Sequence, residues 1–137
     1  MDSELRKLYF IDNRNLIEGN IKIFEQDPEN EEKVLLIITI KNETFNVQED
    51  NLFSALQVLR SILEGKNVQI KCNGAAINVY PSPMQISMGS GRLAYKLTQG
   101  QQAKHSDIVD IFDCDEGLNF VSIEEQLKFY NEWSKTL

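Results

Sequence analysis

The sequence predicts an α+β fold, with a mostly antiparallel sheet, a central helix and a C-terminal helix packed on it, in one domain over residues 1–137. Short segments in which apolar and polar residues alternate are separated by turn formers, a pattern typical of antiparallel strands. Only two longer segments, about 50–64 and about 123–136, carry apolar residues at helical spacing. The strands follow one another in runs, which favours α+β over a doubly wound parallel sheet.

Composition narrows the class of partner. The chain of 137 residues is 42% hydrophobic and 26% charged, as expected for a globular domain with an adequate core. Its net charge of -7 argues against nucleic acid and anionic membranes, and favours a basic protein partner. No apolar run reaches the ~18 residues of a spanning helix, and residues 1–10 lack a signal-peptide pattern. We therefore expect a cytoplasmic protein in which Cys72 and Cys114 are reduced thiols.

The N-terminal third contains one unassigned segment and one strong strand. Residues 5–17 fit a short helix or a strand equally, whereas 20–25 alternate as a strand. A charged, proline-containing turn follows at 25–32. Residues 34–40, VLLIITI, are apolar and β-branched, which predicts a central strand buried on both faces. A short turn then leads into a strand at 44–47, which closes a hairpin.

The central helix is predicted by an apolar stripe. Leu52, Leu56, Leu59 and Leu63 recur at helical spacing. Asp50 is the expected N-cap, and Gly65 stands where a left-handed residue often ends a helix. Residues 68–72 alternate again and predict the next strand.

Residues 67–97 form the stretch around which we expect the molecule to be organised. The stretch opens as a strand, breaks at Asn73-Gly74, crosses an irregular loop and resumes as a strand at 93–97. Two prolines in the loop restrict the backbone and lower the cost of ordering it on binding. The loop carries four side chains of types that are common at interfaces, and the same side chains could equally pack over the hydrophobic core: Tyr80, Met84, Met88 and Tyr95.

The C-terminal segment ends in a helix. Ile108–Phe112 fit one helical turn or a short strand, and the pattern does not separate the two. Ser122 and Glu125 form a capping box that starts a helix. Its expected apolar face is Ile123, Leu127, Tyr130, Trp133 and Leu137. We expect Trp133 to anchor this helix to the sheet.

Carboxylates are densest between the last strand and this helix, at Asp107, Asp110, Asp113, Asp115 and Glu116. They predict a solvated acidic face or a docking surface for a basic partner. The spacing of Asp113, Asp115 and Glu124 fits an EF-hand loop, but Gly117 and Leu118 stand where that loop needs a ligand and a glycine. Two cysteines and one histidine are too few for structural zinc. We expect no metal and no cofactor.

Catalytic candidates are few. Cys72 is the natural nucleophile, and His105 is the only histidine available to activate it, with Asp107 or Asp110 to orient the ring. The glycine-rich run 88–92 matches neither phosphate-loop fingerprint and is better interpreted as a turn between two elements; Ser90 and Arg92 are the side chains that would contact an anion there.

Several short motifs in the second half of the sequence carry a resemblance to other proteins. These are Asn78-Val-Tyr-Pro-Ser82 followed by Met84, Met88-Gly-x-Gly91, Ala94-Tyr95, and Asp107-Ile-Val-Asp-Ile-Phe112. From about residue 72 to the end, the chain resembles a set of small uncharacterised bacterial cytosolic proteins. The resemblance implies a bacterial, intracellular setting and brings no activity with it.

Two functions from different classes follow. The first is a non-enzymatic protein-binding module, of the inhibitor or immunity-protein type, in which the acidic residues steer a basic partner onto Tyr80, Met84, Met88 and Tyr95. The alternative is a small-molecule-binding protein or weak hydrolase that uses Cys72 or Ser90 with His105 and Arg92. A homo-oligomer formed through the same loop is a third expectation.

Overall fold

The computed structural model describes residues 2–137 and has an α+β fold. The principal elements are the strands β1 (Glu4–Asp12), β2 (Asn15–Phe24), β3 (Val34–Ile40), β4 (Glu43–Glu49), β5 (Val68–Lys71), β6 (Val79–Tyr80), β7 (Leu93–Lys96) and β8 (Ile108–Asp110), and the helices α1 (Leu52–Glu64), α2 (Pro83–Met88) and α3 (Ile123–Lys135). Two 3₁₀ turns, η1 (Asn73–Ala75) and η2 (His105–Asp107), complete the described chain.

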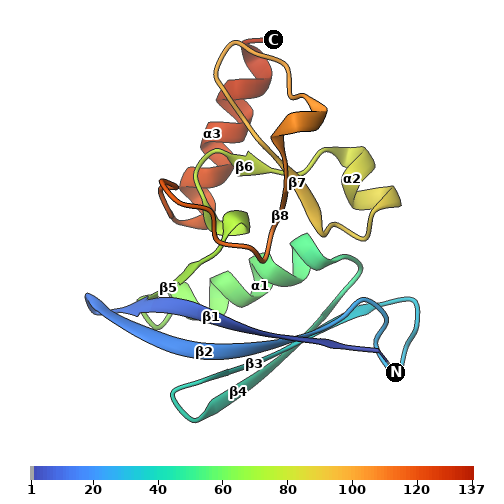
Figure 1. Ribbon diagram of the computed structural model, residues 1–137, viewed down its shortest axis with the longest axis vertical. Helices are drawn as coiled ribbons and strands as arrows, with labels where there is room; N and C mark the ends of the chain where they lie inside the picture. The colour runs from blue at the N-terminus through green and yellow to red at the C-terminus, as the bar shows by residue number, and fades with distance from the viewer. Residues whose placement is uncertain (1) are drawn as a thin grey trace.

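The elements form two layers with α1 between them (Figure 1). The lower layer is a five-stranded antiparallel sheet in the order β4-β3-β2-β1-β5. The upper layer combines a small antiparallel sheet, β6-β7-β8, with α2 and α3. The long central stretch, 67–97, therefore carries the chain from the edge of the lower sheet into the upper layer.

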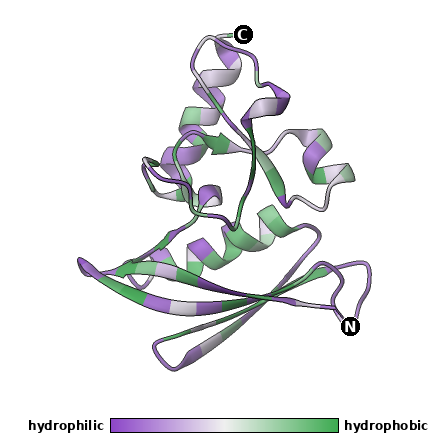
Figure 2. Ribbon diagram, viewed as in Figure 1, coloured by the Kyte–Doolittle hydropathy of each residue, from purple (hydrophilic) through white to green (hydrophobic). Residues whose placement is uncertain are grey.

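One hydrophobic cluster runs through both layers. It joins the inner face of the lower sheet, the buried face of α1, and residues of η1, β6 and β7 such as Ala75, Val79 and Ala94. Figure 2 shows the corresponding pattern, with hydrophilic and hydrophobic residues alternating along the lower strands and α1 largely hydrophobic. Gly74 sits at the junction, where an added Cβ would come within 2.4 Å of Leu56 Cδ2. A glycine is therefore required for η1 to pack this close to α1.

The unassigned N-terminal segment is a hairpin. β1 and β2 pair along their whole length and turn through Asn13 and Arg14, whose φ angles are 50° and 73°. Arginine is an unusual choice for such a turn, so the turn signal was weak in the sequence. The strand expected at 20–25 is the second half of the longer β2.

Strand β3 has the predicted bounds but not the predicted environment. It lies next to the edge strand β4, not at the centre of the sheet. Its residues alternate between buried and more exposed positions, from Val34 and Leu36 inward to Thr39 outward. The expectation of burial on both faces was wrong because α1 covers only one side of this sheet, and β-branched residues on the other side remain partly accessible.

The helices confirm the predicted segments but not every cap. Asn51, and not Asp50, caps α1 by accepting a hydrogen bond from the Ser54 amide at 2.8 Å. Gly65 has φ of -63° and not a left-handed conformation. Ser122 and Glu125 do form the capping box of α3. The segment Ile108–Phe112 was compatible with a helical turn or a short strand, and its residues 108–110 form a strand, β8.

Candidate interaction surface

Helix α2 replaces the irregular loop expected after Pro81. Ser82 accepts a hydrogen bond from the Gln85 amide at 3.1 Å, and the Gln85 side chain accepts one from the Ser82 amide at 2.8 Å. Pro83 occupies the first turn, where a missing N–H costs nothing. The six-residue helix is thus fixed by its own caps. The two capping side chains and Pro83 were visible in the sequence, but the segment is shorter than the patterns that usually identify a helix.

None of the residues of α2 is buried, and its methionines point outward. Met84 is 69% exposed and Met88 is 82% exposed. Both were predicted to contact a partner. An ordered helix that exposes two flexible, polarizable side chains has the properties of a contact surface.

The start of α2 borders an aromatic groove between α3 and the β6-β7 pair. The groove has a volume of about 180 Å³ and is lined by Tyr80, Pro81, Ser82, Pro83, Tyr95, Leu97, Ala103, Tyr130 and Trp133. The Tyr80 and Tyr130 rings stack with centroids 4.2 Å apart, and Tyr130 and Trp133 follow at 6.0 Å. Burial raises the pKa of Tyr80. Tyr80 and Tyr95 were predicted site residues, and the structure places both in this groove.

Trp133 does not anchor α3 to the lower sheet. It lines the aromatic groove, and its indole Nε1 donates a hydrogen bond to the Gln101 carbonyl at 3.0 Å. The predicted apolar face of α3 was also partly wrong, since Leu127 is 44% exposed whereas Gln126 is fully buried. Tyr130 and Trp133 therefore belong to the surface that the sequence assigned to residues 80–95 alone.

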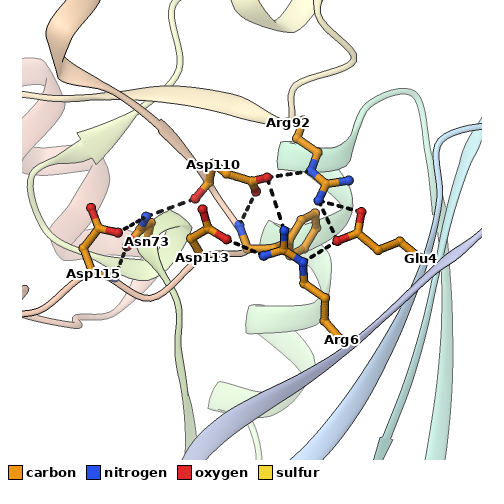
Figure 3. Close-up of polar contacts among 8 residues, drawn as sticks. Glu4, Arg6, Asn73, Arg92, Asp110, Asp113 and Asp115 are labelled. Atoms are coloured by element: carbon orange, nitrogen blue, oxygen red, sulfur yellow. Dashed lines mark hydrogen bonds and ion pairs between the residues drawn. The ribbon is translucent and has the colours of Figure 1, made fainter.

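The acidic segment forms part of an ion-pair hub, which we define as Glu4, Arg6, Arg92, Asp110 and Asp113 (Figure 3). Arg92 Nε lies 3.0 Å from Asp110, and its Nη2 lies 2.9 Å from Glu4. Arg6 contacts Glu4, Asp110 and Asp113. Hydrogen bonds and charge from Arg6 and Arg92 lower the pKa of Glu4 below its ordinary value. The hub ties β1 of the lower layer to β7 and β8 of the upper layer.

Asp115 and Asp107 of the acidic segment also have local partners. Asp115 accepts from Lys96 at 2.7 Å and from Asn73 at 3.2 Å, and these contacts lower the pKa of Asp115. Asp107 accepts from the Lys104 amide at the start of η2. Of the five acidic residues in this segment, three (Asp110, Asp113 and Asp115) are paired with cations of the same chain, which reduces the field they can project towards a partner.

A second acidic region is a groove near Asp2, where Asp2 and Glu25 form no ion pair within residues 2–137. This acidic groove has a volume of about 540 Å³ and is lined by Asp2, Ser3, Glu4, Ile23, Glu25, Gln26 and Arg92. It adjoins the turn after α2, because Ser90 Oγ lies 3.4 Å from Glu25. Residues 2–4 and 25–26 meet because β1 and β2 pair as a hairpin, which the sequence pattern did not predict.

Cys72 is buried as a structural thiol. It is fully inaccessible, and burial raises its pKa to about 12 despite the nearby Arg60 guanidinium. A thiol with that pKa is almost entirely protonated at neutral pH and is a poor nucleophile. Cys114 is exposed, and both cysteines are free.

The other candidates for hydrolysis lie apart from Cys72. His105 is exposed in η2, and Ser90, with φ of 56°, lies in the turn before β7. No hydrogen bond or ion pair within residues 2–137 joins any two of Cys72, Ser90, Arg92 and His105. Arg92 is engaged by two carboxylates, so the pair Ser90 and Arg92 lacks the free positive charge that an anion requires.

Two negative findings apply to the part of the chain that the structure describes. No three histidine, cysteine or acidic side chains within residues 2–137 gather closely enough to hold a metal ion. No helix in the same range is long and apolar enough to cross a membrane.

A buried polar network holds the aromatic groove in place, and sequence reasoning missed it. Arg60 is 1% exposed and donates to Gln57, to the Gly74 and Val121 carbonyls, and to Gln126. Gln126 Nε2 in turn lies 2.8–3.0 Å from the carbonyls of Gly74, Ala76 and Val79. The network joins α1 and α3 to the segment that leads into Tyr80. The available signal was that Arg60 follows Leu56 by four residues, on the apolar stripe of α1.

No family model and no curated protein matches this chain.

Proposed function

We propose that this protein is a non-enzymatic protein-binding module that acts in the cytoplasm on a basic partner, as an inhibitor or immunity-type protein does. Its interaction surface comprises the aromatic groove, the two methionines of α2 and the acidic groove. The observation that carries the proposal is the exposure of Met84 and Met88 on a helix that has no fully buried residue and is nevertheless fixed by a complete capping box.

The three parts of the surface are contiguous. Pro83 at the start of α2 lines the aromatic groove, and Ser90, just beyond its end, contacts Glu25 of the acidic groove. Aromatic and methionine side chains are the apolar residues most enriched at interfaces. The aromatic groove is close in size to the ~150 Å³ cavity that accepts benzene, so it suits one apolar side chain of the partner.

Charge supports a basic partner. Asp2 and Glu25 line the acidic groove without an ion pair in the described residues, beside Glu4, which is paired with Arg6 and Arg92; the whole chain carries a net charge of -7. Such a field accelerates encounter with a cationic protein and weakens as salt is added. Free thiols at Cys72 and Cys114 suit a reducing compartment.

Capture from an extract of the native cells tests this proposal. Three immobilised forms are compared: wild type, Met84→Ser/Met88→Ser, and the matched control Leu5→Ser/Leu16→Ser. The control removes leucines that are 70% and 61% exposed on the lower sheet. We expect wild type and control to retain the same basic protein, which the methionine variant loses and salt releases.

The purified partner then gives the affinity. Loss of two central apolar contacts is expected to weaken binding at least tenfold. Retention of one and the same set of proteins by all three forms would show that α2 is not part of a binding surface.

A further inference from the structure

Strand β4 ends the lower sheet and leaves one side of its backbone open (Figure 1). The two-residue turn Lys41-Asn42, with φ of 52° and 64°, makes Ile40 and Glu43 a hydrogen-bonded pair. Alternation along the antiparallel ladder then directs the N–H and C=O groups of Thr44, Asn46 and Gln48 away from β3. No backbone hydrogen bond in the described chain uses these groups.

The usual protections of a sheet edge are missing from β4. Its register with β3 is continuous over seven residues, so it has no bulge, and the segment ETFNVQE contains neither proline nor lysine. The opposite edge, β5, is only four residues long and continues directly into η1. β4 is therefore the edge of this sheet that can accept another strand.

The side chains of β4 specify what kind of strand would fit. Glu43, Phe45, Val47 and Glu49 share the face towards α1, since side chains alternate along a strand. Acidic residues thus stand at both ends of this face and apolar residues in the middle, and the Glu43 carboxylate lies 3.7 Å from the Lys66 ammonium. Cross-strand neighbours that match this face are basic, apolar, apolar and basic in turn. Because the order reads the same in both directions, it applies to parallel and antiparallel partners.

Helix α1 extends apolar cover towards the same edge. α1 packs on β4 as well as on β3 and β5. Just beyond the end of α1, the Lys66 ammonium lies 5.7 Å from the centre of the Phe45 ring, so the chain that leaves the helix also contacts β4. Val58 and Ile62 are four residues apart in α1 and so lie on one face of the helix. Val58 is 38% exposed and Ile62 is half-buried.

We propose that β4 is a second interaction site, which binds an extended segment of a partner protein with the pattern basic–x–apolar–x–apolar–x–basic as a sixth strand of the lower sheet. Backbone hydrogen bonds to Thr44, Asn46 and Gln48 supply the pairing. Glu49 selects the basic residue at one end, and Glu43, whose side chain stays 57% exposed beside Lys66, selects the one at the other end. The apolar residues pack beside Phe45 and Val47. This mode of recognition is strand addition to a sheet edge.

A second copy of the chain fits this edge poorly. Antiparallel pairing of two β4 strands centred on Asn46 would set Glu43 opposite Glu49 at both ends. Like charges directly opposite each other destabilise a strand pair. The edge therefore favours a basic strand over self-association.

The test uses a synthetic peptide, acetyl-Lys-Thr-Val-Thr-Val-Thr-Lys-amide, and the full chain. Binding is followed by NMR titration and by hydrogen exchange of the backbone amides. We expect the amides of Thr44, Asn46 and Gln48 to become protected, while those of Phe45 and Val47, already bonded to β3, change little. Asn46→Pro removes an outward donor without removing a β3 bond and should abolish binding. Glu43→Lys/Glu49→Lys should weaken it about tenfold.

Two controls separate this proposal from the proposed function. Met84→Ser/Met88→Ser should bind the peptide as wild type does, since α2 lies in the other layer. An acidic peptide with glutamate in place of both lysines should not bind. Unchanged exchange at residues 44, 46 and 48, or equal binding of the two peptides, would overturn the inference. Sedimentation that detects a dimer lost in Asn46→Pro would also overturn it, in favour of self-association.

Discussion

Replacing Gln126 by leucine tests the buried network that supports the aromatic groove. The side chain is fully buried, and its amide lies within hydrogen-bond distance of three carbonyls on η1 and β6, while its carbonyl accepts from Arg60 and Gln57. Leucine fills a similar volume but supplies none of these groups. Arg60, which is itself buried and whose pKa burial lowers, loses an acceptor.

The expected cost follows from the bonds lost. Each buried hydrogen bond contributes about 1 kcal/mol, and an unpartnered buried polar group costs more. Since some of the carbonyls have other donors, such as the Val79 amide on Ala76, we expect a loss of about 3 kcal/mol. For a chain of this length this corresponds to a melting temperature lower by about 10 °C.

The matched control is the next residue, Leu127→Ala. Leu127 is 44% exposed, so this change should cost less than about 1 kcal/mol. Both variants are measured by urea unfolding, with Trp133 fluorescence reporting on the groove. A neutral Gln126→Leu, or a larger loss in Leu127→Ala, would refute the assignment of α3's buried face.

Three further predictions concern the thiols, the ion-pair hub and η1. In native protein at pH 7, iodoacetamide should label Cys114 as fast as it labels free cysteine and should leave Cys72 unlabelled. The variant Cys114→Ser should therefore react only in denaturant. Rapid labelling of Cys72 would revive the hydrolase alternative. The pKa of Glu4 is lowered in the folded protein, so Glu4 stabilises the fold at pH values above its ordinary pKa of 4.5, and this contribution is lost as the pH falls through the pKa of the folded state. Glu4→Gln should flatten this part of the curve of stability against pH. An unchanged curve would contradict the hub. Gly74→Ala should destabilise the protein by about 2 kcal/mol because the added Cβ would clash with Leu56. Gly65 has φ of -63° and room for a methyl group, so Gly65→Ala should stabilise the protein by about 0.5 kcal/mol. Similar effects at both sites would contradict the close packing of η1.

The fold class could be predicted from the sequence because local patterns determine it. The leucines of α1, the capping box at Ser122 and the alternation at 68–72 each report on a few neighbouring residues, and the structure confirms those elements. Elements defined by weaker local signals were missed. The turn Asn13-Arg14 lacks glycine, and α2 is only six residues long.

The candidate site could be predicted only in part from the sequence, because its contacts join residues that are far apart along the chain. Tyr80, Met84, Met88 and Tyr95 were identified from residue type, and the structure places them on or beside one surface. Nothing local links Arg6 to Asp113, Arg60 to Gln126, or Glu25 to Ser90. The acidic segment was read as free charge because the arginines that pair with it lie 18 to 107 residues away.

The most direct test of the binding surface is oxidation of the methionines in the free and the bound protein. Peroxide treatment followed by peptide mass spectrometry measures the rate at Met84 and Met88 separately. Free protein should oxidise rapidly at both, since they are 69% and 82% exposed. In complex with the purified basic partner, we predict that both rates fall at least tenfold. Rates unchanged by a partner bound at saturation would contradict the account.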